Sequence, residues 1–365
     1  MQITAQMVKD LREKTGAGMM KCKEALAECN GNLEEAIDFL RKKGLASADK
    51  RSGRATSQGL VIPLTTADRR TSAIVEVNCE TDFVARNDDF GTFANKIAEL
   101  VLNNPSVKTV EDLNKLSIEG QSVEEFVKTM IAKTGENISI SRAEHLSFAA
   151  GQNGIFDTYI HGEGTIGVLI QTKTETEAAS KNSELSNYVH EVALQVAAMN
   201  PMALSSDYIT QEDKTRELNI AIDKTKAELI AKSVNKALEK EKINPAHVDS
   251  EDHMKSNMEK GWITQEAVDK AREIIKTVSA SAAASLDDKM IHSIAEGRLK
   301  KYFKENCLLE QAYVKDDKKS IADLTTEVSK AIGAKVELVT FRRWARGEAA
   351  AAEASQQENS AEAAG

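Results

Sequence analysis

Four consecutive residues have the types and the position to act on a partner molecule: Thr81, Asp82, Phe83 and Val84. They follow an apolar, β-branched run at residues 72–77 that predicts a strand, and they precede an amphipathic helix expected at residues 89–102. A turn between a strand and a helix can offer its side chains to a partner. A carboxylate there can disturb a charged site, and a large aromatic ring beside it can enter an apolar slot. The plainer alternative is a capping aspartate next to a buried phenylalanine.

Two other motifs suggest chemistry, and each has a plainer interpretation. Residues 162–167 have the GxGxxG spacing of a dinucleotide loop, but the run at residues 168–172 predicts a strand where such a loop needs a helix. We therefore expect a hairpin turn, and the sequence has no P-loop motif that would hold GTP. A thiol enzyme built on Cys79 remains an alternative, although the sequence shows no base to activate that residue.

The composition narrows the class of protein. The 365 residues carry 57 acidic and 48 basic side chains, a formal net charge of −9, whereas a general nucleic-acid binder has a basic excess. The cysteines and histidines lack metal-ligand spacing, so we expect no metal and no cofactor. No run approaches the roughly 20 apolar residues of a membrane span, and the charged N-terminus does not fit a signal peptide. These features predict a cytoplasmic protein without direct contact to nucleic acid or membrane.

Periodicity predicts an α+β protein with two related halves. Strand, turn, strand and helix follow one another twice along the chain, which indicates two small antiparallel sheets with helices on them. We expect the second half to lack the Thr-Asp-Phe segment of the first. The expected boundaries are 1–44 for three short helices, 45–58 for a linker, 59–150 for the first half, 151–225 with 290–346 for the second half, 226–289 for an inserted helical, coiled-coil-like region and 347–365 for a disordered tail.

Two parts of the sequence together resemble elongation factor Ts, the bacterial guanine-nucleotide exchange factor of elongation factor Tu. One is the N-terminal block at residues 3–26 and 31–37, and the other is the motif at residues 81–85, in the order and spacing of that family. The resemblance implies that the N-terminal helices form a module similar to ubiquitin-associated domains. It also implies a protein that acts by binding, with no covalent step.

The family's mechanism, carried onto this sequence, implies two sets of residues that meet elongation factor Tu in its GDP-bound and nucleotide-free states. One set dislodges the Mg²⁺ that holds GDP in the partner, and the other binds the partner. The first set is Thr81, Asp82, Phe83 and Val84, and the second is Met19, Met20, Lys21 and Cys22.

The inserted region leaves alternatives open. The resemblance covers about residues 1–225 and 290–346, and it thins in between, where Ile263, Ile274 and Met290 are spare apolar positions. A homodimer through the insertion is therefore an alternative to a projecting hairpin. For the whole chain, the alternative function is a helical adaptor that binds another partner and has no exchange activity.

Overall fold

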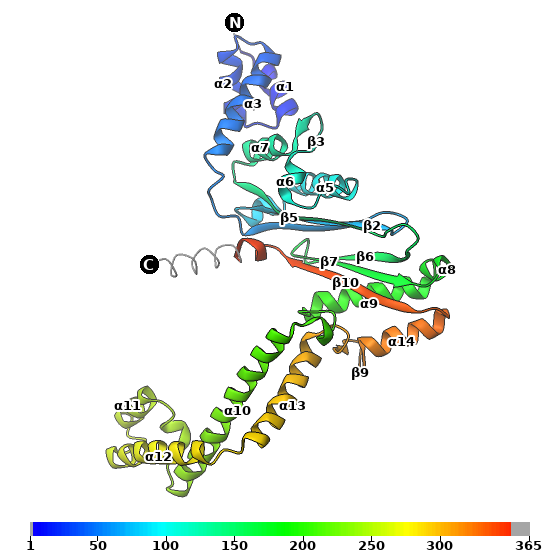
Figure 1. The fold of residues 1–365 in the computed structure, drawn as a ribbon. Helices are drawn as coiled ribbons and strands as arrows, with labels where there is room; N and C mark the ends of the chain where they lie inside the picture. Colours follow the sequence, from blue (N-terminus) through cyan, green and yellow to red (C-terminus); the bar gives the residue numbers. More distant parts are fainter. Residues whose placement is uncertain (1–2, 352–365) are drawn as a thin grey trace. The chain divides into compact units, whose positions relative to one another are not determined.

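The computed structural model describes residues 3–351 (Figure 1). The chain forms two compact units, one from residues 1–200 with 313–365 and one from residues 201–312. The first unit contains the N-terminal helices and both halves of the α+β scaffold, and the second unit is helical. The predicted α+β class, with small antiparallel sheets, is confirmed.

Three helices form the N-terminal module, namely α1 (Ala5–Thr15), α2 (Met19–Glu28) and α3 (Leu33–Asp49). Their apolar faces meet in a small core that contains Leu11, Cys22 and Leu26. Gly16 ends α1 with φ of 66°, a left-handed conformation that glycine adopts without steric cost. Helix α3 continues past the expected boundary at residue 44, because Ala48 is buried against the core of the first half.

The first half is a three-stranded antiparallel sheet with helices on one face. Its strands are β1 (Gln58–Thr65), β2 (Thr71–Cys79) and β5 (Ile138–Ser147), in the order β1-β2-β5. Between β2 and β5 lie α4 (Asp82–Ala85), α5 (Asp88–Leu102), α6 (Val110–Asn114), β3 (Ser117–Ile118), β4 (Gln121–Ser122) and α7 (Val123–Thr134). The amphipathic face predicted for α5 packs on the sheet and buries Phe90, Phe93 and Ile97.

The second half has the same plan. Its strands are β6 (Asn153–His161), β7 (Ile166–Thr174) and β10 (Val336–Ala345), in the order β10-β7-β6. Helices α8 (Glu177–Ser180) and α9 (Ser183–Met199) follow β7, and β8 (Ala312–Tyr313), β9 (Asp316–Ser320) and α14 (Ile321–Ile332) precede β10. The glycines of residues 162–167 lie in the β6–β7 hairpin, as the sequence predicts, so a strand occupies the place where a dinucleotide loop would need a helix.

The likeness of the two halves extends to single residues. The first strand of each half carries a glycine, Gly59 or Gly154, with φ of 140° and 150°. A Cβ atom there would lie 2.1 or 2.0 Å from a carbonyl oxygen of the middle strand, so only glycine fits. In both halves a β-bulge interrupts the pairing of the middle strand with the third strand. The shared register makes Cys79 at the end of β2 the counterpart of Thr174 at the end of β7.

The two sheets pack face to face, and helices lie on the outer face of each (Figure 1). Val61 of β1, Phe156 of β6 and Leu169 of β7 are buried between the sheets. The Arg142 guanidinium Nε donates to the buried carboxylate of Glu76 at 2.7 Å, so a charge that is out of reach of solvent has a charged partner.

The expected disordered tail, residues 347–365, lies for the most part outside the described residues. Residues 348–351 are helical. The Gly347 N–H donates to Oε1 of Glu76 at 2.7 Å, and the Glu348 carboxylate pairs with Arg142 at 3.6 Å. These contacts attach the chain after β10 to the first half.

The second unit is larger than the insertion expected at residues 226–289. It contains α10 (Gln211–Lys240), α11 (Glu251–Glu259), α12 (Gln265–Ala284), α13 (Asp288–Asn306) and 3-10 turns at Ser206–Tyr208 and Pro245–His247. The expected boundary at residue 225 falls inside α10. The start of this helix was not predicted because the helix is polar, buries few side chains and has no strong apolar period. Ile263 and Ile274 pack against the unit's own core around Leu238, whereas Met290 stays 45% exposed.

Candidate functional site

The residues Thr81 to Val84 form a short projecting tip at the end of β2, which we call the first tip. Thr81 is the N-cap of the one-turn helix α4, and its hydroxyl oxygen accepts a hydrogen bond from the Val84 N–H at 3.4 Å. Phe83 is 84% exposed, the highest value among the large exposed apolar side chains of the described residues. The Asp82 carboxylate lies 3.7 Å from the Arg86 guanidinium, and both side chains are partly in solvent. The first tip therefore offers an acidic and an aromatic side chain side by side.

The carboxylates of Glu136 and Glu80 accept hydrogen bonds at the base of the first tip. The Thr81 N–H donates to Oε2 of Glu136 at 3.0 Å, and the Thr81 hydroxyl donates to Oε1 of the same carboxylate at 2.6 Å. In the opposite direction, Oε1 of Glu80 accepts the Asn137 N–H at 2.6 Å. Hydrogen bonds to a charged acceptor are short and strong. The end of β2 and the start of β5 are thus joined at two neighbouring positions.

The four predicted residues of the first tip divide into two pairs. Thr81 is bound on both sides by internal hydrogen bonds, and Val84 packs against the core of the first half. Asp82 and Phe83 point their functional groups outward. Asp82 and Phe83 are therefore the residues of the first tip whose functional groups are accessible from solvent, and the other two support the helical turn.

Cys79 belongs to the support as well. Its side chain is fully buried, and its thiol donates to the Thr81 carbonyl oxygen at 3.2 Å. Burial raises the pKa of this thiol to about 12, and the nearby Glu136 charge raises the pKa in the same direction. A thiol that stays protonated and is inaccessible to solvent is no nucleophile at neutral pH, which argues against the thiol-enzyme alternative.

The predicted partner-binding residues of α2 also divide by exposure. Met19 and Met20 are 54% and 77% exposed, and Lys21 is exposed beside them. Cys22 is fully buried, and its thiol donates to the Ala17 carbonyl oxygen at 3.4 Å. Because methionine is apolar and flexible, an exposed pair suits a contact surface. Cys22 packs the module that carries this surface.

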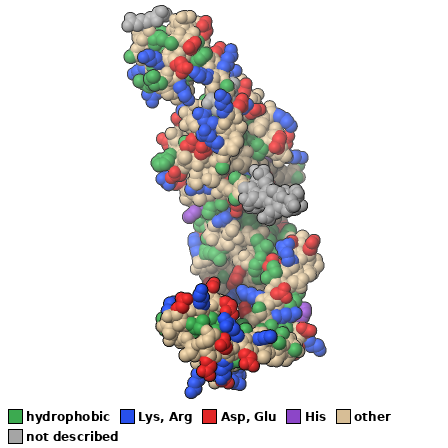
Figure 2. Space-filling model, turned by 90° about the vertical axis from the view of Figure 1, so that its left-hand side faces the viewer, with side chains coloured by type: hydrophobic (Ala, Val, Ile, Leu, Met, Phe, Trp, Pro, Cys, Tyr) green, Lys and Arg blue, Asp and Glu red, His purple; other side chains and the backbone are tan. Residues whose placement is uncertain are grey.

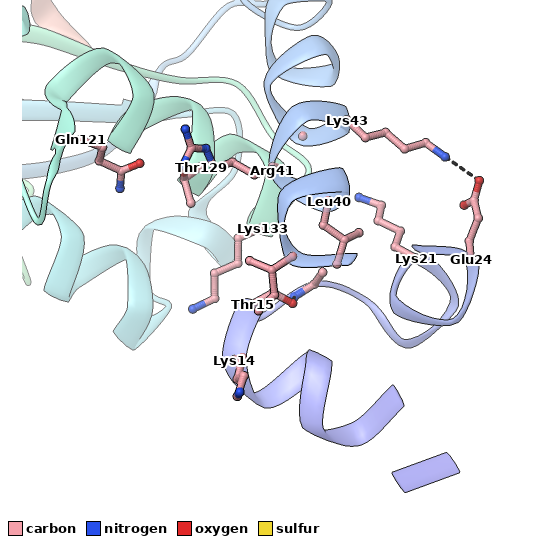
Figure 3. A pocket seen from close by; sticks show the side chains of 14 residues that line it. Lys14, Thr15, Lys21, Glu24, Leu40, Arg41, Lys43, Gln121, Thr129 and Lys133 are labelled. Atoms are coloured by element: carbon pink, nitrogen blue, oxygen red, sulfur yellow. Dashed lines mark hydrogen bonds and ion pairs between the residues drawn. The ribbon is translucent and has the colours of Figure 1, made fainter. Parts of the chain in front are cut away.

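A cavity of about 400 Å³ lies between the N-terminal module and α7 (Figure 3). Its basic lining residues are Lys14, Lys21, Arg41, Lys43 and Lys133, and they come from α1, α2, α3 and α7. The Glu24 carboxylate is paired with Lys43 at 2.5 Å, and Ile37 and Leu40 add an apolar wall. Lys133 is paired with the Asp89 carboxylate at 2.6 Å. The positive charge of Lys14, Lys21 and Arg41 and the apolar wall suit a surface that presents acidic and apolar side chains.

The second half lacks the Thr-Asp-Phe residues, as expected, but it has a one-turn helix at the same place, which we call the second tip. After β7, Thr176 caps the one-turn helix α8, and its hydroxyl oxygen accepts from the Ala179 N–H at 3.2 Å. A second cap follows in each half, with Asn87 at the start of α5 and Asn182 at the start of α9. In this second tip, Ala178 is the counterpart of Phe83. The two tips therefore share a backbone and differ in their side chains.

Glu136 is the residue of this site that the sequence analysis did not identify. It is 55 positions away from Thr81 in the chain, and only the pairing of β5 with β2 brings the two together. A single carboxylate after a helix carries no signature of such a contact. It becomes recognisable only when the register of the two strands is known.

Other kinds of site find no support within residues 3–351. No group of three or more His, Cys, Asp or Glu side chains in this range could hold a metal ion. In the same range, no helix is both long and apolar enough to cross a membrane. On the face shown in Figure 2, acidic and basic side chains are interspersed and do not gather into one basic patch.

Comparisons with known proteins agree on one family. A family described as Elongation factor TS matches residues 80–348. The chain is 41% identical to an elongation factor Ts of Phocaeicola vulgatus over 345 residues, which are 94% of this chain and 98% of that relative. It is 40% identical to one of Bacteroides thetaiotaomicron, over 94% of this chain and 98% of the relative. For one of Clostridium perfringens the identity is 39%, over 95% of this chain and 93% of the relative.

These matches correct the expected extent of the resemblance. The family match spans residues 80–348, a range that includes the helical unit at residues 201–312, and the first relative covers 94% of the chain. The resemblance therefore extends beyond the expected ranges 1–225 and 290–346, because the matched length leaves too few residues outside it to omit the whole stretch between them.

Proposed function

Because this chain belongs to the elongation factor Ts family of translation elongation factors, we propose that it binds elongation factor Tu and speeds the exchange of GDP for GTP without a covalent step. The physical basis is linkage between two binding events. A protein that binds the nucleotide-free partner more tightly than the GDP-bound partner must weaken GDP binding by the same factor. Such a protein would act in the cytoplasm, where its partner works.

The first tip supplies the step that weakens GDP. A Mg²⁺ ion bound to a nucleotide neutralises much of the diphosphate charge. The carboxylate of Asp82 disturbs the ligands and waters that hold the ion, and the ring of Phe83 enters an apolar slot between helices of the partner. Once the ion is lost, the phosphate charges repel one another without compensation and GDP leaves.

The N-terminal module supplies a second point of attachment. A single turn of helix buries too little surface for stable binding, so the tip needs a separate grip. Met19 and Met20 offer an exposed apolar patch on α2, and Lys21 adds a charge at the edge of the cavity next to α7. The second half and the strand β10 would hold another domain of the partner.

The observation that carries this proposal is the exposure of Phe83 on a tip that is held firmly in place. A phenylalanine that is 84% exposed forgoes burial, and the hydrogen bonds from Thr81 to Glu136 fix the turn on which it sits. A large apolar side chain that is exposed to solvent, on a turn fixed by internal hydrogen bonds, is typical of a binding site.

The test is the rate at which a fluorescent GDP leaves elongation factor Tu. The partner is loaded with the labelled nucleotide, chased with excess unlabelled GDP, and mixed with rising concentrations of the full chain. The proposal predicts a release rate that rises and saturates, and Cys79→Ser should behave like the unmodified chain. Binding of the partner at an unchanged release rate would instead identify a helical adaptor, the alternative that the exposed methionines of α2 support.

A further inference from the structure

We propose that Glu136 is a positioning residue for nucleotide exchange: its carboxylate fixes Thr81 and thereby sets the direction in which Asp82 and Phe83 are presented. This inference rests on the proposed function and adds to it a residue outside the motif at residues 81–85. Glu136 is partly buried and lies behind the tip, two residues before β5, so it acts through Thr81.

The hydrogen bonds form a continuous chain from the carboxylate to the helix. Glu136 accepts from both donors of Thr81, the N–H at 3.0 Å and the hydroxyl at 2.6 Å. The hydroxyl is then oriented with its lone pairs free to accept from the Val84 N–H, which closes the first turn of α4. Because Phe83 itself is almost fully in solvent, its position depends on this turn and on the packing of Val84 and Ala85 behind it.

The second tip shows that the fold itself does not need this carboxylate. The register of β5 and β10 makes Ala334 the counterpart of Glu136, since each residue follows a left-handed glycine and precedes the third strand. Thr176 therefore caps α8 although its half has an alanine in place of the clamping carboxylate.

A second contact at the same place serves as an internal control. The Glu80 carboxylate accepts the N–H of Asn137 at 2.6 Å, and its counterpart Glu175 accepts the N–H of Lys335 at 3.2 Å. This strand-joining bond occurs in both halves and belongs to the scaffold. The clamp on the threonine occurs in the half that carries the exposed phenylalanine, which links the clamp to the function of that tip.

The predicted consequence is a loss of rate with little loss of affinity. Without the clamp, α4 samples other orientations, and a smaller fraction of complexes has Phe83 and Asp82 in the productive position. The grip through the N-terminal module and the second half is unchanged. The maximal rate of GDP release should therefore fall, while the concentration that gives half of that rate should stay nearly the same.

The experiment measures both quantities for the full chain and three variants. Glu136→Ala removes the clamp. Glu136→Gln keeps an oxygen for the Thr81 N–H and an amide group for the hydroxyl. Glu175→Ala removes the scaffold bond in the other half and controls for a general loss of stability, which thermal unfolding of each variant reports.

We expect Glu136→Ala to lower the maximal rate about tenfold, as for the loss of charged hydrogen bonds, and to change the half-saturating concentration less than about twofold. Glu136→Gln should recover most of the rate, and Glu175→Ala should keep it. An unchanged maximal rate in Glu136→Ala, a change in half-saturation alone, or an equal loss in Glu175→Ala would overturn the positioning role. If the unmodified chain leaves GDP release unchanged, the proposed function fails and the positioning role fails with it.

Discussion

The first tip and the second tip follow one backbone plan and carry different side chains. Each is a strand end, a capping threonine, one turn of helix and a capping asparagine before a long helix. Among the side chains that differ are Phe83 against Ala178, Asp82 against Glu177, and Glu136 against Ala334. The shared part is what the scaffold requires, so the differences indicate what was added for function.

The comparison also gives a sense of the energetic cost. Leaving a phenylalanine side chain in water forgoes about 1.5–3 kcal/mol that burial would supply. The second tip avoids this loss because Ala178 has almost no apolar side chain to bury. The scaffold therefore has a small residue at this position in its other half, so folding does not account for the phenylalanine of the first tip, and the proposed function does.

The largest effect is expected when the first tip is made to resemble the second. Asp82→Ala with Phe83→Ala should slow stimulated GDP release about tenfold or more and leave complex formation largely intact, because neither side chain is buried in the fold. Stopped-flow release of labelled GDP at saturating factor measures the rate, and a binding titration measures the complex. Glu177→Ala, which gives the second tip the same Ala-Ala pair, is the matched control and should keep the full rate. An equal loss of the GDP release rate in both variants would contradict the functional difference between the two tips.

A smaller effect on the rate of GDP release is expected when the helical unit inserted in the second half is shortened. The helical unit is inserted between α9 and β8, where the first half has only the residues 103–116. Replacing residues 232–285 with a short Gly/Ser linker removes the core around Leu238 and keeps the cluster of Ile222 and Ile291. The rate of GDP release should stay within about threefold, since the tip and the module are untouched. A collapse of the rate in a variant whose circular dichroism shows a folded remainder would assign the insertion to the exchange machinery.

The smallest effect on exchange is expected from Cys79, whose counterpart is Thr174. Cys79→Ser should leave the GDP release rate unchanged, because the protonated thiol takes no part in chemistry. The pKa, raised by burial from 9.0 to about 12, affects stability instead. The contribution of the protonated Cys79 thiol to the free energy of unfolding is complete below about pH 9. It is lost as the pH rises from about 9 to 12, because the thiol of the unfolded chain then releases a proton that the thiol of the folded chain keeps.

Thermal unfolding of the two proteins from about pH 8 to 10.5 checks this sign. The unmodified chain should lose stability more steeply than Cys79→Ser over that interval. Parallel curves would show that the buried thiol does not titrate as its environment predicts.

Much of the scaffold was predictable because its signals are local. The β-branched run of β2 and the apolar period of α5 are read directly from neighbouring residues, and both elements lie where they were expected. The turn at residues 162–167 was separated from a nucleotide loop by the strand after it. In each case the residues that decide the structure stand next to one another in the sequence.

The remaining features depend on contacts between distant residues. Glu136 reaches Thr81 only through the register of two strands, and the second tip is recognisable only from its backbone. The extension of α3 depends on the burial of Ala48 against another part of the unit. Periodicity within a short window carries no information about such pairings.

The most direct test of the central claim compares stimulated GDP release with and without Mg²⁺. The full chain and the Asp82→Ala, Phe83→Ala variant are assayed at saturating concentration, first in the presence of Mg²⁺ and then with excess chelator. If the first tip acts by dislodging the partner's ion, the variant should be about tenfold slower with Mg²⁺ and nearly equal to the full chain once the ion has been removed. A defect of the same size under both conditions would contradict the account.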